Sequence, residues 1–260
     1  MLPFATNPPP QKPKKKKVAP PVKGIVNFYE LPKIRALSTK TINPYYHQHG
    51  LKVPFRMIIL GSTGSGKTNA LMNLIHQCQN TFHKIIIITA AEEQFYTHLQ
   101  NEFTSDLVTV KYSLDYMRTF NESHFFGQTL CIFDDQINVK DQRCIEELFI
   151  RGRKKNVSLV YLSQSFFKIS KIIRLQTQYV LIVKSSSDRD LKLVMSDYSL
   201  GTTKEQMVAM YDRICNQNVF GDFLMIDLNA PQSRTFRHNF DKIIRFLPGS
   251  DSMVEEEAVF

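Results

Sequence analysis

Short apolar runs alternate with segments of helical periodicity from about Val53 onward. The runs that predict strands are FRMIIL (55–60), KIIIIT (84–89), TLCIFDD (129–135), VSLVYLSQ (157–164), YVLIVKS (179–185) and DFLMIDL (222–228). KIIIIT is rich in β-branched residues and lacks polar alternation, which is typical of a strand buried on both faces of a sheet.

Helical periodicity fills several intervals between these runs. In 68–78 the apolar residues recur on one helical face; they are Ala70, Leu71, Leu74, Ile75 and Cys78. Further helices are predicted near 95–103, from Cys144 to Phe149 and at 203–215. Strands that alternate with helices predict an α/β fold with a mostly parallel sheet covered on both faces.

The two ends of the chain differ in composition from this body. Residues 1–23 are rich in Pro and Lys and carry too few large apolar groups to fold, so they predict a disordered arm. Its PKKKK stretch fits a nuclear-import signal, a nucleic-acid arm or a solvated run of charge. The expected organisation is this arm, one α/β domain at 24–250 and an acidic tail at 251–260.

The chain is basic, with a formal net charge of +9 over 260 residues. Residues 1–23 hold six lysines and no acid, whereas 251–260 hold four acidic residues, so the body between them is itself basic. That balance suits a partner made of phosphates, although a soluble basic protein shares it.

No apolar run approaches the length that spans a bilayer, and the N-terminus does not read as a secretion signal. We therefore expect a soluble intracellular protein without a membrane span. The four cysteines (Cys78, Cys131, Cys144 and Cys215) are far apart and form no CxxC pair. Reduced core thiols are favoured over disulfides or zinc ligands.

The stretch GSTGSGKT (61–68) matches the pattern G-x-x-x-x-G-K-[ST] at every fixed position. It lies between a predicted strand and a predicted helix, which is the context that a phosphate-binding loop requires. The expected nucleotide-binding residues are Gly61, Ser62, Thr63, Gly64, Ser65, Gly66, Lys67 and Thr68. Lys67 would reach the β- and γ-phosphates of ATP, and the Thr68 hydroxyl would join the shell of Mg²⁺.

Two aspartates, Asp134 and Asp135, end the strand TLCIFDD. A carboxylate at a strand end next to the phosphate loop can hold Mg²⁺, and Asp134 is the candidate. Asp135 would lie nearer the γ-phosphate, where it could orient and deprotonate a water. The pair therefore favours hydrolysis over transfer of phosphate to a second substrate.

Gln164 ends the strand VSLVYLSQ, where an amide could hydrogen-bond the γ-phosphate and the attacking water. The basic stretch RGRKKN (151–156) precedes that strand. An arginine of one subunit can stabilise the transition state in the next subunit's site; Arg153 is the first candidate and Arg151 the second. A contact to nucleic-acid backbone or a solvated loop remains open for this stretch.

Three stretches together resemble a known family: PFRMIILGSTGSGKTNALMNLI, LCIFDDQI and RGRKKNVSLVYLSQSFFKISKIIR. They resemble the poxvirus-type DNA-packaging ATPases of large DNA viruses, within the FtsK–HerA superfamily, over roughly residues 50–185. The resemblance implies a P-loop NTPase of the RecA/ASCE-like type with a Walker A at 61–68, a Walker B at Asp134 and Asp135 and a sensor at Gln164. Many superfamily members carry Glu where Asp135 stands.

The same resemblance implies an ATP-driven, ring-shaped motor that moves double-stranded DNA into a preformed capsid at the site of virion assembly. The implied partners are double-stranded DNA, further copies of the chain and a capsid or portal-vertex protein. An arginine finger upstream of the sensor strand would fall on Arg153, with Arg174 as an alternative finger or DNA contact. Phe166, Phe167 and Lys168 could touch DNA, although packing against the sheet is favoured for both rings.

Other functions fit part of the pattern. A cellular-type FtsK–HerA translocase or helicase would share the chemistry and differ in its partner. A nucleotide-gated assembly switch would bind ATP without useful turnover, and Asp135 and Gln164 count against it. A small-molecule kinase would use RGRKK as its lid, but the paired aspartates fit hydrolysis better.

Overall fold

The structure is a computed structural model, and two separate units make up the chain, one up to Lys40 and one from Thr41 to Phe260. It describes all residues except 1–26, 36–39, 119–124, 126, 186–187, 199, 217–218 and 248–251. The predicted Lys/Pro-rich arm therefore lies outside the described residues. The described residues of the first unit include a 3₁₀ turn, η1 (Phe28–Glu30), and a single helical turn, α1 (Pro32–Arg35).

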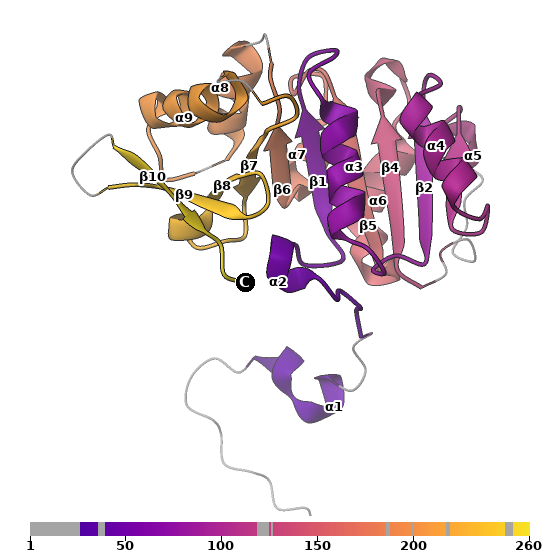
Figure 1. The fold of residues 1–260 in the computed structure, drawn as a ribbon. Helices are drawn as coiled ribbons and strands as arrows, with labels where there is room; N and C mark the ends of the chain where they lie inside the picture. The colour runs from indigo at the N-terminus through magenta and orange to yellow at the C-terminus, as the bar shows by residue number, and fades with distance from the viewer. Residues whose placement is uncertain are drawn as a thin grey trace, which may run out of the picture. The chain divides into compact units, whose positions relative to one another are not determined.

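The second unit is built on one sheet, which has ten strands within the described residues (Figure 1). The strands are β1 (Arg56–Leu60), β2 (Lys84–Thr89), β3 (Val108–Lys111), β4 (Thr129–Asp134), β5 (Val157–Ser163), β6 (Tyr179–Ile182), β7 (Leu224–Asp227), β8 (Phe236–His238), β9 (Lys242–Phe246) and β10 (Met253–Glu257). Their order across the sheet is β10-β9-β8-β7-β6-β1-β5-β4-β2-β3.

The sheet has a parallel part and an antiparallel part. Strands β3, β2, β4, β5, β1 and β6 are parallel to their neighbours, whereas every pair from β6–β7 to β9–β10 is antiparallel. The parallel part contains the five runs predicted between residues 55 and 185. The expectation of an α/β fold with a mostly parallel sheet is thus confirmed.

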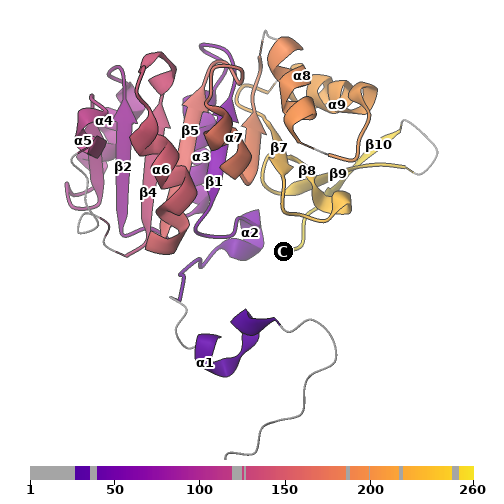
Figure 2. The same ribbon diagram turned by 180° about the vertical axis from the view of Figure 1, so that it is seen from behind.

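Helices cover both faces of the sheet, and α2 lies beyond one end of its strands (Figures 1 and 2). The helices of this unit are α2 (Tyr46–His49), α3 (Lys67–Gln77), α4 (Gln94–Glu102), α5 (Asp115–Arg118), α6 (Arg143–Arg151), α7 (Lys171–Gln176), α8 (Asp188–Asp197) and α9 (Lys204–Tyr211), with short 3₁₀ or π turns η3 (Gln136–Asn138), η4 (Gly152–Lys155), η5 (Asp212–Asn216) and η6 (Gln232–Arg234). Helices α3 and α4 pack into one hydrophobic cluster, and α6 to α9 pack into the other.

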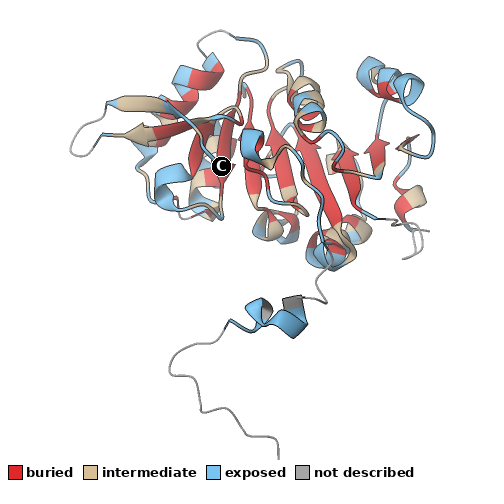
Figure 3. Ribbon diagram, turned by 60° about the horizontal axis from the view of Figure 1, so that its bottom comes forward, coloured by how far each residue is buried: buried red, intermediate tan, exposed pale blue. Residues whose placement is uncertain are grey.

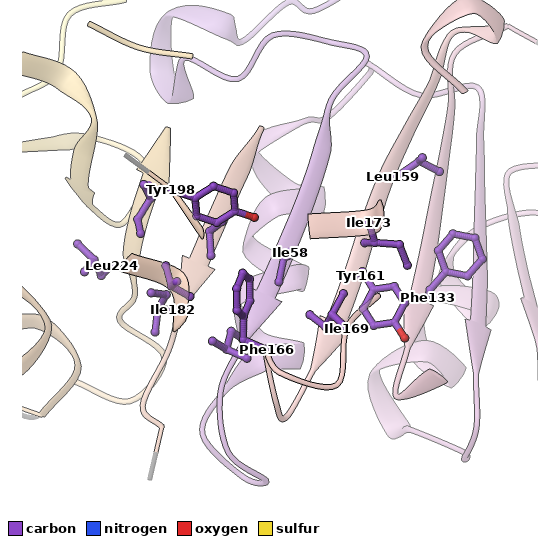
Figure 4. Packing of buried hydrophobic residues seen from close by; sticks show 14 of the residues in the cluster. Ile58, Phe133, Leu159, Tyr161, Phe166, Ile169, Ile173, Ile182, Tyr198 and Leu224 are labelled. Atoms are coloured by element: carbon purple, nitrogen blue, oxygen red, sulfur yellow. The ribbon is translucent and has the colours of Figure 1, made fainter. Parts of the chain in front are cut away.

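Alternation along the strands explains the two clusters. In β1, Met57 and Ile59 belong to the cluster under α3, whereas Ile58 and Leu60 belong to the cluster on the opposite face. Successive side chains of a strand point to opposite faces, so a strand covered on both sides needs apolar residues throughout. The central strands are accordingly buried along their length (Figure 3), and Figure 4 shows the aromatic packing around Phe166.

The acidic segment at 251–260, expected as a tail, contributes an edge strand. Met253–Glu257 forms β10, which pairs antiparallel with β9. Its acidic residues have basic partners, because Glu256 lies 3.2 Å from Arg245 and Glu255 lies 3.1 Å from His238. The opposite charges of Arg245 on β9 and Glu256 on β10 favour this pairing.

Candidate nucleotide-binding and catalytic site

The predicted phosphate loop connects the carboxyl end of β1 to the amino end of α3, at the centre of the sheet (Figure 1). Gly66 has φ +97°, a left-handed conformation that L side chains rarely adopt. A β-carbon on Gly61 would lie 2.2 Å from Cγ2 of Val183, so that position has no room for a side chain. Gly66 is therefore required by its backbone conformation, and Gly61 by the close approach of the Val183 side chain.

Lys67 and Thr68 are the first two residues of α3 and are half-buried. The Lys67 Nζ donates a hydrogen bond to the carbonyl of Ser62 at 2.8 Å, so the side chain lies back over its own loop. Burial lowers the pKa of Lys67, against the opposing effect of the negative charges of Asp134 and Asp135. The amino group and both carboxylates thus share one electrostatic environment.

Asp134 is the last residue of β4 and has a defined hydrogen-bond partner. The Tyr96 hydroxyl, on α4, donates to Oδ2 of Asp134 at 2.8 Å. Burial raises the pKa of Asp134, the bond from Tyr96 opposes that rise, and the charge of Asp135 adds to it. Glu93, just before α4, raises it further. Asp134 is therefore a desolvated carboxylate whose negative charge depends on its neighbours.

Asp135 turns the chain sharply after β4. Its φ is +53°, in the left-handed region that is uncommon for residues other than glycine. Its Oδ1 is buried, and among the described residues nothing hydrogen-bonds to it. Strained backbone and an unpaired buried oxygen are features that cluster at functional sites.

Gln164 follows β5, and β5 lies between β1 and β4 in the sheet. This order places the residue after β5 between the phosphate loop and the two aspartates. The Thr63 hydroxyl, in the phosphate loop, donates to Oε1 of Gln164 at 3.0 Å. The three predicted motifs therefore converge on one edge of the sheet, because the carboxyl ends of parallel strands share an edge.

Arg151 and Arg153 lie at the opposite end of the sheet, near the amino end of β5. Arg151 ends α6, and Arg153 is in η4, immediately before β5. Both side chains are exposed. The seven residues of β5 separate Arg153 from Gln164 by roughly 20 Å. Neither arginine can reach the phosphate loop of its own chain.

Arg174, the alternative finger, is engaged within the chain. On α7 it forms an ion pair with Asp197, with side chains 12% and 22% exposed, and its guanidinium lies 5.2 Å from the centroid of the Phe166 ring. Phe166 is buried, as expected, whereas Phe167 is 54% exposed. Arg174 thus has a structural role in this conformation.

Some residues at this edge of the sheet were not singled out from sequence. Tyr96 falls on the apolar side of a predicted helix and reads as core packing, yet its hydroxyl contacts Asp134. Gln136 is buried and donates to the carbonyl of Asp134 at 2.9 Å. The sequence did carry a signal for Tyr96. A tyrosine on the apolar face of a helix indicates a buried hydroxyl, which needs a hydrogen-bond partner.

The donor set fits a nucleoside triphosphate with a divalent cation. The glycine loop offers backbone N–H groups at the start of an eleven-residue helix, which favours phosphate. Thr68 and Asp134 supply the oxygen atoms that Mg²⁺ prefers. The unpaired oxygen of Asp135 fits a group that accepts a hydrogen bond from water.

The fold and the site define this chain as a P-loop NTPase in which β5, the strand before Gln164, separates the phosphate-loop strand β1 from the carboxylate strand β4. The chain belongs to the poxvirus A32 protein family, whose sequence model matches residues 43–228. The resemblance to the poxvirus-type family is confirmed.

Individual relatives agree with this assignment. A DNA packaging protein of Variola virus is 24% identical over 135 residues, covering 47% of this chain and 50% of that protein. Its counterpart in Vaccinia virus (strain Copenhagen) is 25% identical over 129 residues, covering 45% and 48%. The chain thus spans about half the length of the curated relatives it matches.

Solved structures share the fold. The genome packaging NTPase B204 of Sulfolobus turreted icosahedral virus 2, in complex with ATP-γ-S, superposes with a TM-score of 0.53 at 17% identity, covering 73% of this chain and 98% of that chain. VirB4 of Thermoanaerobacter pseudethanolicus gives 0.51 at 10% identity, covering 74% and 90%. At such identities the likeness shows the fold alone.

Within the described residues, no helix is long and apolar enough to cross a membrane.

Proposed function

We propose that this chain is a Mg²⁺-dependent ATPase that moves double-stranded DNA during virion assembly. The observation that carries the proposal is the hydrogen bond between Thr63 and Gln164. It joins the phosphate loop to the residue after β5, next to the strand that ends in the two aspartates. A site that only held nucleotide would not need a sensor and a base on adjacent strands.

The residues divide the chemistry as follows. Lys67 and the loop N–H groups would hold the β- and γ-phosphates, and Thr68 and Asp134 would hold Mg²⁺, which would neutralise developing charge when bound. Asp135 accepts a proton from water as the water oxygen bonds to the γ-phosphorus. The bond from that phosphorus to the β,γ-bridging oxygen breaks, and ADP leaves. The Gln164 amide orients the water and contacts the γ-phosphate.

Arg153 acts in trans. It is exposed at the end of the sheet opposite the phosphate loop, so a catalytic contribution from Arg153 would go to the site of another copy. Head-to-tail contacts of this kind generate rings when the rotation closes. A homo-oligomeric ring with sites shared between neighbours is the assembly that this placement favours.

Double-stranded DNA is the proposed substrate of movement, because the relatives from Variola and Vaccinia viruses are DNA packaging proteins. Exposed cations follow the sensor: Lys168 and Lys171 lie after Gln164, and Arg189 lies over the Phe167 ring at 4.0 Å. Such cations suit contacts with DNA phosphates. We propose a capsid or portal-vertex protein as the further partner, at the site of virion assembly inside the host cell.

The test is steady-state ATP hydrolysis by the purified chain, with and without long double-stranded DNA, at two salt concentrations. We expect Mg²⁺-dependent turnover that DNA stimulates, with the stimulation lost at high salt because phosphate contacts release counterions. Binding of ATP without turnover in either condition would instead support a nucleotide-gated switch.

A further inference from the structure

A turn distant in sequence from the phosphate loop packs directly against it. A β-carbon added to Gly66 would lie 3.1 Å from Cα of Gly221 and 3.6 Å from Cζ of Phe220. Gly221 in turn approaches α3 so closely that a β-carbon there would lie 2.3 Å from Nδ2 of Asn69. The described turn 219–222 therefore forms part of the wall of the nucleotide site.

The sheet order places this turn on the side of the loop where a nucleoside must lie. The γ-phosphate end of a bound triphosphate faces β5 and β4, which carry Gln164 and the aspartates. The nucleoside end must point the other way, toward β6 and β7. Leu224, the first residue of β7, pairs with Ile182 at the end of β6, and Ile182 pairs with Leu60 at the end of β1. The turn before β7 is thus level with the phosphate loop.

The turn is held in place by side chains, although Phe220 itself is 73% exposed. Asn239 donates from Nδ2 to Asp222 at 2.9 Å and accepts a bond from the backbone N–H of Phe223 at 3.1 Å. His238 lies 3.2 Å from the same Asp222 carboxylate. An aromatic ring is therefore presented to solvent from a fixed backbone beside the phosphate cradle.

A polar cavity of about 450 Å³ lies next to the ring, within the range of roughly 300–1,000 Å³ usual for small-molecule sites. The turn forms one wall and the polar side of α3 another, and Gln48 and the β8–β9 connection (239–241) complete the lining. The residues of these two walls include Asn69, Asn73, Gln77, Phe220, Gly221 and Asp222. The cavity gives the sugar and base of a nucleotide space and hydrogen-bonding partners.

We infer that Phe220 is the platform on which the nucleobase of the bound triphosphate stacks, and that the turn 219–222 forms the nucleoside half of the site. The inference rests on the proposed nucleotide binding at the phosphate loop. Stacking is available to every base, because each has a π face. Stacking on Phe220 therefore strengthens the binding of nucleoside triphosphates in general, and it raises the affinities for ATP and GTP by similar factors.

The experiment compares ATP with inorganic tripolyphosphate, which fills the phosphate cradle but has no base. Binding of each, with Mg²⁺, is measured by calorimetry on the full chain and on Phe220→Ala. We expect Phe220→Ala to weaken ATP about tenfold, as loss of one stacking contact does, and GTP by a similar factor. Tripolyphosphate affinity should stay within about twofold. Equal losses for ATP and tripolyphosphate, or no loss for either, would overturn the inference.

A second variant gives a direct signal, because the chain contains no tryptophan. Phe220→Trp should keep ATP affinity and show fluorescence quenched by ATP but not by tripolyphosphate. Phe103→Trp, at a position 45% exposed at the end of α4, is the matched control and should not respond. If Phe220→Trp binds ATP without a spectral change, the base does not stack there, while the proposed ATPase stands. If wild-type protein binds neither ligand, both proposals fail.

Discussion

The hydroxyl of Thr63 donates a hydrogen bond to the side-chain carbonyl of Gln164 across 3.0 Å, joining residues that are 101 positions apart in sequence. Thr63 belongs to the phosphate loop, and Gln164 directly follows β5, the strand between that loop and the strand of the aspartates. A phosphate bound in the loop would compete for the same groups. Under the proposed function, the bond would give Gln164 a direct means of responding to the nucleotide.

Replacing Gln164 with Ala should slow hydrolysis and leave binding nearly intact. The amide stabilises charge and water position only as the γ-phosphate is attacked, so we expect about a hundredfold loss in kcat. The dissociation constant for ATP should change less than about threefold, because the loop carries that affinity. Single-turnover hydrolysis and calorimetry measure the two quantities. Wild-type kcat in this variant would remove Gln164 from the chemistry.

Asp135→Asn should bind ATP and fail to turn it over. Loss of a general base costs about a hundredfold or more in rate, while the amide keeps the size of the carboxylate. Glu93→Gln is the control, because Glu93 is a nearby carboxylate that raises the pKa of Asp134. We expect Glu93→Gln to retain most activity. The reverse outcome, with Glu93→Gln inactive and Asp135→Asn active, would make Glu93 the base.

Much of the fold could be predicted from the apolar pattern. The five runs between residues 55 and 185 are strands, because each is long and apolar enough to be buried on both faces. Strands that mix apolar and polar residues could not be predicted. β3 (VTVK) and β8 (FRH) lack a continuous apolar run, so neither pattern separates a strand from a loop.

The site was predictable where a local motif exists and not where partners are far apart in sequence. The phosphate loop and the strand end at Asp134 are local patterns. The bond from Tyr96 to Asp134 spans 38 positions, and the contact of Phe220 with Gly66 depends on the packing of β6 and β7. The acidic composition of 251–260 predicted a tail, but the segment forms β10 and its glutamates pair with basic residues of the sheet.

Tyr96→Phe should shift the acidic limb of the pH–rate profile to higher pH. The proposed Mg²⁺ binding would need Asp134 ionised, and the pKa of Asp134 is already raised by burial. The Tyr96 hydroxyl favours the ionised form, so its removal raises that pKa further and protonates the carboxylate at a higher pH. We also expect about tenfold lower affinity for Mg²⁺, as for other residues that orient a metal ligand. An acidic limb that is unchanged would show that the hydroxyl only packs.

Arg174→Ala should lower the free energy of unfolding of the protein. Its ion pair with Asp197 is largely buried, and removal of one partner leaves an uncompensated charge. We expect a loss of about 2–3 kcal/mol in the free energy of unfolding, measured by urea denaturation. Residual activity per folded molecule should be near that of wild type. If the variant keeps full stability but loses DNA-stimulated turnover, Arg174 is the finger after all.

Arg153→Ala should abolish turnover in a way that a second inactive variant repairs. The arginine lies at the end of the sheet opposite its own phosphate loop, so under the proposed function its loss would affect the site of a neighbouring copy. An arginine finger is worth about a thousandfold in kcat, so Arg153→Ala alone should be nearly inactive. Asp135→Asn alone should be inactive for a different reason. A mixed ring contains interfaces where an intact Asp135 on one copy meets an intact Arg153 on the next, and those sites should work.

The measurement is DNA-stimulated hydrolysis at fixed total protein across mixing ratios, with light scattering to show that both variants assemble. Activity should be lowest for each variant alone and pass through a maximum near equal amounts. Arg151→Ala, exposed at the same edge, and Arg143→Ala, whose side chain is 82% exposed, are the matched controls. Rescue with Arg151→Ala in place of Arg153→Ala would move the finger by two positions. A flat mixing curve from two assembled variants would mean that each site is complete within one chain, and that the basic stretch before β5 serves another partner.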